Sequence, residues 1–252
     1  MVLTRSGAEI VADEHDDGVV CKLHRPGTDP RALAARLRVA AASDCFLDPL
    51  TLVPDRVGTR WMTRWPRVET VVPQPHDLPW AEAGRLLARL HTERFAARNP
   101  ANGWPQRMRR AVDAARHHDV VRCAAAALPD AAWRPGSPDR PSTLVHGDWH
   151  LGQLGRRTAQ SPWLLIDVDD LGVGDPAWDL ARPAGFWAAG LIPDSDWATF
   201  VGAYSDAGGP ADPSAIEPFA RAAVVQAAAG GVAHGDDDET QAALIDACAR
   251  MR

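Results

Sequence analysis

Two apolar segments of this sequence end in aspartates that lie nineteen residues apart. Residues 145–148 read VHGD and end in Asp148, and residues 164–167 read LLID and end in Asp167. Gln153 lies between them and offers a neutral oxygen ligand. Phosphoryl transfer uses such a set, because one carboxylate accepts the proton of the attacking hydroxyl while other oxygens hold Mg²⁺ against the triphosphate. The pattern therefore predicts a phosphotransferase whose carboxylates are mounted rigidly at strand ends.

The stretches around the two aspartates carry a longer motif. Residues 145–153 read VHGDWHLGQ, and residues 166–181 read IDVDDLGVGDPAWDLA. This resembles the aminoglycoside phosphotransferase family, whose pattern is HGDxxxxN followed by IDxxxxxxGDPxxDLA. That family has the protein-kinase-like fold and includes kinases of antibiotics, choline, homoserine and sugars. The resemblance implies an ATP- and Mg²⁺-dependent enzyme in which Asp148 is the catalytic base and Asp167 the principal Mg²⁺ ligand.

Gln153 departs from the family pattern, because it stands where the family usually has asparagine. Glutamine carries the same amide carbonyl on a side chain that is one methylene longer, so the resemblance implies a second metal ligand in a slightly shifted place. The form HGDxHxxQ is similar to the maltokinase and bacterial glucosamine kinase branch, which favours a sugar or another hydroxyl compound as acceptor. Asp175 and Asp179 are interpreted as structural, bracing the catalytic loop and starting a helix.

Lys22 is the only lysine among the 27 lysine and arginine residues. It lies in a β-branched run that follows an Asp-Gly turn, and residues 8–12 and 19–24 are therefore expected to form a hairpin. In kinase-like folds a strand lysine holds the α- and β-phosphates of ATP. Lysine suits this task as a compact point charge. We expect Lys22 to bind the nucleotide in this way.

The partner of Lys22 is not determined by the sequence. The helix expected over residues 29–42 contains no glutamate that could pair with it. Glu9, Asp29 and Asp44 are alternatives that the sequence does not separate. Only Ser6-Gly7 stands where a glycine-rich phosphate loop is expected, so this N-terminal lobe is interpreted as reduced.

The order of the expected elements predicts an α+β protein with two lobes. Strands come first, prolines then cluster at Pro73, Pro75 and Pro79, and mostly helical residues with one hairpin follow. A helix is expected from Trp80, and a single Ala/Arg-rich helix over 107–127.

The class that we expect is a bilobed protein-kinase-like fold with a reduced β-rich N-lobe. Residues 1–66 would grip the nucleotide phosphates, and residues 67–252 would hold the catalytic loop, the metal site and the substrate pocket. Trp65 and Arg67 fall where the hinge between the lobes is expected, and their backbone is a candidate for contacting adenine.

The composition excludes several other classes of protein. A net charge of −6 does not favour nucleic-acid binding. No apolar run approaches the ~18 residues of a membrane span, and no signal peptide is recognised at the start. The four cysteines are far apart and are interpreted as buried free thiols. A cytoplasmic protein is therefore expected, with a small-molecule hydroxyl compound as its acceptor.

Several alternatives remain open at this stage. The acceptor could instead be a peptide Ser/Thr, phosphorylated with the help of a protein partner in natural-product biosynthesis. The chain could also be a catalytically weak binding module with a kinase fold. Trp149, next to the base, could stack on a sugar ring or pack beneath the loop. Residues 236–239 are typical of a solvated helix start, although an acidic clamp for an amine substrate is an alternative.

Overall fold

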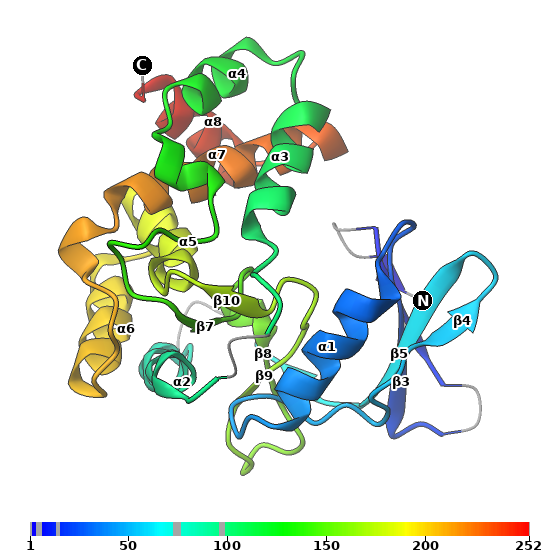
Figure 1. The fold of residues 1–252 in the computed structure, drawn as a ribbon. Coiled ribbons are helices and arrows are strands. Elements are labelled where there is room, and N and C mark those ends of the chain that lie inside the picture. Colours follow the sequence, from blue (N-terminus) through cyan, green and yellow to red (C-terminus); the bar gives the residue numbers. More distant parts are fainter. Residues whose placement is uncertain (1, 4–6, 14–15, 73–76, 96–98, 252) are drawn as a thin grey trace. The chain divides into compact units, whose positions relative to one another are not determined.

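The computed structural model describes residues 2–3, 7–13, 16–72, 77–95 and 99–251. Ser6, Pro73 and Pro75, which the sequence analysis used, lie outside the described residues. The chain divides into two compact units (Figure 1). Unit 1 comprises residues 1–79, 96–100 and 151–169, and unit 2 comprises residues 80–95, 101–150 and 170–252. The division into functional lobes at residue 66 stays a prediction.

An antiparallel five-stranded sheet forms the first part of unit 1, in the order β1-β2-β3-β5-β4. Its strands are β1 (Val2–Leu3), β2 (Glu9–Ala12), β3 (Val19–Leu23), β4 (Asp55–Val57) and β5 (Arg60–Pro66). The hairpin expected from the Asp-Gly turn is present as β2 and β3. Lys22 lies on the central strand β3, opposite Ile10 on one side and Thr63 on the other. Its backbone is therefore held from both sides.

Helix α1 (Pro30–Ala41) follows the hairpin. The Asp29 side chain accepts a hydrogen bond of 2.9 Å from the amide of Arg31 and so caps the helix. Leu33, Leu37 and Ala40 are buried. The helix expected over residues 29–42 is therefore present.

A second sheet of unit 1 carries the segment that ends at Asp167. Its strand order is β6-β8-β9, with β6 (Glu69–Thr70), β8 (Leu154–Arg156) and β9 (Leu164–Leu165). The amide of Leu165 donates to the carbonyl of Cys45, and the amide of Leu47 donates to the carbonyl of Leu165. The strands expected at residues 143–145 and 163–167 are present but have other partners than one hairpin would give them, because β9 pairs with β8 while β7 (Thr143–Val145) pairs with β10 (Gly172–Gly174).

Unit 2 is mostly helical, with the β7–β10 pair beside its helices (Figure 1). The helices are α2 (Trp80–Thr92), α3 (Trp104–Ala114), α4 (Asp119–Ala126), α5 (Ala177–Ala188), α6 (Asp194–Asp206), α7 (Glu217–His234) and α8 (Glu239–Ala249). Short 3₁₀ turns occur at Asp130–Trp133 and Pro213–Ala215 in this unit, and at Leu151–Gln153 in unit 1. Helix α7 packs against α3, α5 and α8 and supplies much of the core.

The single helix expected over residues 107–127 is wrong. Two helices occupy this region, α3 and α4, and the chain turns between them at residues 115–118. Arginine and alanine are good helix formers, and no glycine or proline marks the turn. Packing decides instead, because α3 lies on α7 whereas α4 packs mainly on α8.

No helix in the described part of the chain is long and apolar enough to cross a membrane. The four cysteines are free thiols, three of them buried and Cys123 exposed. The expectation of buried thiols is confirmed for Cys21, Cys45 and Cys248 and is wrong for Cys123.

Candidate active site

Unit 1 contains a cavity of about 330 Å³ beside the five-stranded sheet. One part of its wall is apolar, with Ile10, Val20, Leu47, Trp65, Val68, Ile166 and Val168. The other part is polar, with Lys22, His24, Gln153, Asp167 and Asp169. An apolar wall next to a few convergent charged groups is the usual form of a small-molecule site. The structure thus brings together Lys22, Trp65, Gln153 and Asp167, four of the residues predicted to bind nucleotide or metal.

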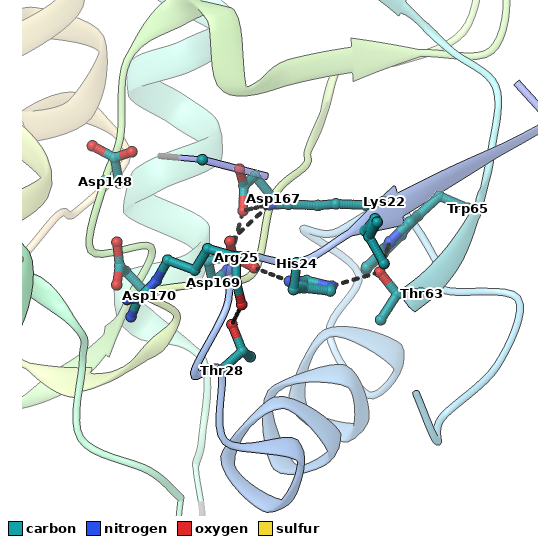
Figure 2. Close-up of polar contacts among 12 residues, drawn as sticks. Lys22, His24, Arg25, Thr28, Thr63, Trp65, Asp148, Asp167, Asp169 and Asp170 are labelled. Atoms are coloured by element: carbon teal, nitrogen blue, oxygen red, sulfur yellow. Dashed lines mark hydrogen bonds and ion pairs between the residues drawn. The ribbon is translucent and has the colours of Figure 1, made fainter. Parts of the chain in front are cut away.

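Lys22 is held by two carboxylates (Figure 2). Its Nζ lies 2.7 Å from Asp167 Oδ1 and 2.9 Å from Asp169 Oδ2. Burial would lower the pKa of Lys22, but the charges of Asp167 and Asp169 outweigh burial and raise it. The ammonium is therefore charged at any physiological pH. It stands in the cavity as a fixed point charge.

None of the earlier candidates is the observed partner of Lys22. Glu9 pairs with Arg60 at 2.5 Å, and Asp29 caps helix α1. Asp44 has no described contact with Lys22. The partner carboxylates come instead from the segment after β9, 145 residues further along the chain in the case of Asp167. Two residues so far apart in the sequence cannot be recognised as partners without the fold.

Asp169 is further supported by His24 (Figure 2). His24 is 1% exposed, and its Nδ1 lies 3.0 Å from Asp169 Oδ1. Its Nε2 lies 2.9 Å from Thr63 Oγ1, which also accepts a 2.8 Å hydrogen bond from Trp65 Nε1. Burial raises the pKa of Asp169, but the charge of Lys22 and the contact with His24 outweigh burial and hold it well below its ordinary value. Asp169 is therefore an anion.

Asp167 adopts a left-handed backbone conformation with φ of 65°. This region is uncommon for residues other than glycine, although aspartate tolerates it better than most. The described polar contacts of its carboxylate use Oδ1, which receives Lys22 Nζ and, at 3.1 Å, the amide of Asp169. A non-glycine residue held in this region often belongs to a functional site.

The residues of this cavity fit a magnesium ion. Asp167 and Gln153 line the same cavity and offer a carboxylate and an amide oxygen, which are ligands that Mg²⁺ accepts. No group of three or more His, Cys, Asp or Glu side chains in the described ranges could hold a metal by itself. A site with few protein ligands is expected where substrate phosphates complete the coordination of Mg²⁺.

Trp65 and Arg67 are placed differently. The Trp65 side chain is buried and lines the cavity, as does Pro66. Arg67 is exposed and is not among the described lining residues. Its amide donates to the carbonyl of Gly18 at 2.7 Å, and its Nε donates to the carbonyl of Asp17 at 2.5 Å. Arg67 therefore closes the β2–β3 turn onto the end of β5.

Unit 2 holds the loop that carries His146, Gly147 and Asp148. Asp179, near the start of α5, accepts hydrogen bonds from the amides of His146 at 2.6 Å and Gly147 at 2.8 Å. His91 Nε2 lies 3.0 Å from the same carboxylate. Asp179 is fully buried, so these bonds fix the loop without solvent competition. The structural interpretation of Asp179 agrees with these contacts.

Gly147 is required by the geometry of this loop. Its φ is 83°, and a Cβ added here would lie 2.4 Å from the carbonyl oxygen of Asp170. Any side chain would both strain the backbone and collide with that carbonyl. The glycine of the motif thus allows the loop to approach the chain at Asp170.

Asp148, the predicted base, contacts two arginines. Arg107 Nη2 lies 2.8 Å from Asp148 Oδ2, and Arg182 Nη1 lies 3.4 Å from Asp148 Oδ1. Arg107 also binds Asp170 at 2.5 Å, so one guanidinium bridges two carboxylates. Such bonds orient a carboxylate and favour its charged form. The two arginines therefore hold the Asp148 carboxylate in one orientation.

Trp149 and His150 follow Asp148 in the motif. The Trp149 ring is not exposed, and His150 is not a cation. Trp149 is 1% exposed and stacks on Phe200 with ring centroids 4.9 Å apart, so it packs beneath the loop. Burial lowers the pKa of His150 well below its ordinary value, and the nearby Arg182, His146 and Arg107 lower it further. His150 is therefore a neutral imidazole at neutral pH.

Two further acidic groups of unit 2 are structural. Asp175 binds Arg140, and its Oδ1 accepts a 2.9 Å hydrogen bond from the amide of Ala177 at the start of α5. Asp238 caps α8 by accepting a 2.8 Å hydrogen bond from the amide of Gln241. Helix α8 packs on α4 and α7, so the interpretation of residues 236–239 as a helix start agrees with the structure.

Three residues that contact the candidate site residues were not predicted from the sequence, namely His24, Arg107 and Asp169. Asp169 falls on a variable position of the family motif, and Arg107 is one of many arginines in an Arg-rich helix. His24 gave one usable signal, because it follows β3 directly and lies two residues after Lys22, the spacing at which side chains of an extended chain share a face. Only the folded sheet brings it next to Asp169.

Several solved structures of kinases and phosphotransferases have a fold similar to that of this chain. The ethanolamine kinase of Plasmodium vivax is 11% identical, with a TM-score of 0.61 over 96% of this chain and 78% of that one. An aminoglycoside phosphotransferase from Streptomyces rimosus is 17% identical, with a TM-score of 0.54 over 88% and 93%. A spectinomycin phosphotransferase, solved with ADP and spectinomycin, is 13% identical, with a TM-score of 0.54 over 96% and 88%. At these identities the likeness concerns the fold.

Family membership follows from the sequence itself. The model of the phosphotransferase enzyme family, abbreviated APH, matches residues 11–219. The chain belongs to this family. A search of curated protein sequences gives no significant match. The predicted family, the α+β kinase-like fold and the phosphotransferase class of enzyme are therefore confirmed.

Proposed function

We propose that this chain transfers the γ-phosphoryl group of ATP to a hydroxyl of a small molecule, such as an aminoglycoside, amino sugar, sugar or related metabolite. The observation that carries the proposal is the cavity of unit 1, where the buried Lys22 and the partly exposed Asp167 form an ion pair beside an apolar wall. The wall suits a planar base, and the charged end suits phosphates and a metal. The similar structures named for ethanolamine, aminoglycoside and spectinomycin kinases support a hydroxyl acceptor.

The chain's residues divide the work. Lys22 would hold the phosphates, Trp65 and the backbone near Arg67 would contact the base, and Asp167 and Gln153 would hold Mg²⁺. When bound, Mg²⁺ neutralises charge on the phosphates. Asp148 would orient the acceptor hydroxyl and take its proton, and Arg107 and Arg182 would keep its carboxylate oriented and anionic. Most of the rate acceleration would come from positioning and charge neutralisation.

A screen of acceptors tests this proposal. Aminoglycosides, amino sugars, maltose and choline are incubated with Mg²⁺-ATP, and phosphorylated product is measured by mass spectrometry. We expect one class of acceptor to be phosphorylated by the wild-type protein and by an Asp113→Ala control, whose side chain is 79% exposed. The Asp148→Ala variant should yield no product. Full activity in that variant would contradict the assignment of the base.

A further inference from the structure

The means by which Lys22 is held differs from that of protein kinases. There the strand lysine is positioned by a glutamate of the following helix. Here the following helix is α1, whose sequence PRALAARLRVAA contains no acidic residue. A lysine that must grip phosphates still needs a fixed anion, because its four-carbon chain is flexible and its ammonium is buried.

Asp169 has the position and charge that this task needs. Its Oδ2 lies 2.9 Å from Lys22 Nζ, and its side chain is only 20% exposed. Asp167 also contacts Lys22, at 2.7 Å, but it is the candidate ligand of the metal. A carboxylate that serves a divalent cation holds a neighbouring ammonium less well, because the two cations repel. Asp169 can serve Lys22 without this conflict.

A row of buried polar contacts lies behind Asp169 (Figure 2). Trp65 Nε1–H donates to Thr63 Oγ1, which forms a 2.9 Å hydrogen bond with His24 Nε2. The other ring nitrogen of His24, Nδ1, lies 3.0 Å from Asp169 Oδ1. His24, Thr63 and Trp65 are all buried, so the His24 ring is held beside Asp169 by packing and by its bond to Thr63.

We propose that Asp169, oriented by His24, is the residue that positions Lys22 for the nucleotide phosphates, in place of the missing helix glutamate. This inference rests on the proposed function, because it assigns Lys22 to the nucleotide. Asp169 is a positioning residue, since it acts through Lys22.

The inference is tested by measuring the affinity for ADP by calorimetry with Mg²⁺. A change at Asp169 should move this affinity in the direction opposite to that expected from charge alone. Asp169→Asn removes a negative charge near the phosphates, which by charge alone would tighten ADP binding. If Asp169 positions Lys22, the same change should weaken ADP binding about tenfold, as for the loss of one hydrogen bond to a charged group. Asp55→Asn is the matched control, because Asp55 pairs with Arg64 on the same sheet but does not line the cavity.

A double-mutant cycle with Lys22→Met separates positioning from general damage. In the Lys22→Met background, adding Asp169→Asn should change the remaining ADP affinity by no more than about twofold. In the protein that keeps Lys22, Asp169→Glu should weaken ADP binding less than Asp169→Asn does. His24→Asn should weaken ADP binding in the same direction, and it serves as the second probe if Asp169→Asn does not fold.

The outcomes distinguish this inference from the proposed function. Unchanged or tighter ADP binding in folded Asp169→Asn would overturn the role of Asp169 while leaving the proposed function in place. Equal losses with and without Lys22 would also overturn it. No ADP binding by the wild-type protein would contradict the proposed function itself, and the inference with it.

Discussion

At the scale of single residues, each candidate functional aspartate is restrained by charged or polar neighbours. Asp148 contacts Arg107 and Arg182, and Asp167 contacts Lys22 and the amide of Asp169. Restrained carboxylates suit a reaction in which positioning supplies most of the catalysis. The acceptor must therefore fit a base that is already oriented.

Gln153 provides a test of the metal site at this scale. Gln153→Ala should raise the Mg²⁺ concentration for half-maximal activity by about tenfold or more, because an oxygen ligand is lost. Gln153→Asn, which restores the family residue, should raise it less. Magnesium titrations of the phosphoryl-transfer rate measure both effects. Gln160→Ala is the control, since Gln160 is exposed in the same unit. An unchanged magnesium requirement in Gln153→Ala would contradict the role of this residue.

At the scale of elements, Asp179 ties the catalytic loop to the helices of unit 2. It lies in α5, accepts two amides of the loop after β7, and contacts His91 of α2. His91 Nδ1 in turn lies 2.8 Å from the hydroxyl of Tyr204 in α6, and this hydroxyl accepts a hydrogen bond from the amide of Ala211. Burial raises the pKa of Tyr204, so its phenol stays neutral within this network. One carboxylate therefore organises three helices and the loop.

Replacing Asp179 should consequently destabilise the fold. Asp179→Ala leaves two buried amides and His91 without their acceptor, and we expect a loss of about 3 kcal/mol in the free energy of unfolding. Denaturant unfolding followed by circular dichroism measures this loss. Asp113→Ala, at an exposed site on α3, should stay within about 0.5 kcal/mol of the wild type. A loss for Asp179→Ala no larger than that of the control would refute the bracing role.

Elements with strong local signals were predictable from the sequence. The β2–β3 hairpin, the Asp29 cap of α1 and the helix from Trp80 each depend on nearby residues. The break between α3 and α4 and the pairing of β7 with β10 were not predictable, because tertiary packing decides them. The site shows the same division. The aspartates of the motif were predicted from the sequence. Asp169 and His24 were not, because only the folded chain brings them next to Lys22 and to each other.

At the scale of the whole molecule, the candidate groups fall into two compact units of one chain. Lys22, Gln153 and Asp167 belong to unit 1, whereas Asp148 and its arginines belong to unit 2. Residues that share a unit share its packing, so a change at Asp148 should leave the cavity of unit 1 intact. Nucleotide binding and proton abstraction are therefore expected to be separable by mutation.

The proposed roles are tested most directly by comparing the ATP affinity and the turnover of the Asp148→Ala variant with those of the wild-type protein. Calorimetry with Mg²⁺-ATP should give a dissociation constant within about threefold of the wild-type value, because the nucleotide-binding residues are untouched. Phosphorylation of the acceptor found in the screen should fall by at least about a thousandfold, which corresponds to the loss of the general base. Loss of ATP binding together with turnover, or retention of both, would contradict the account.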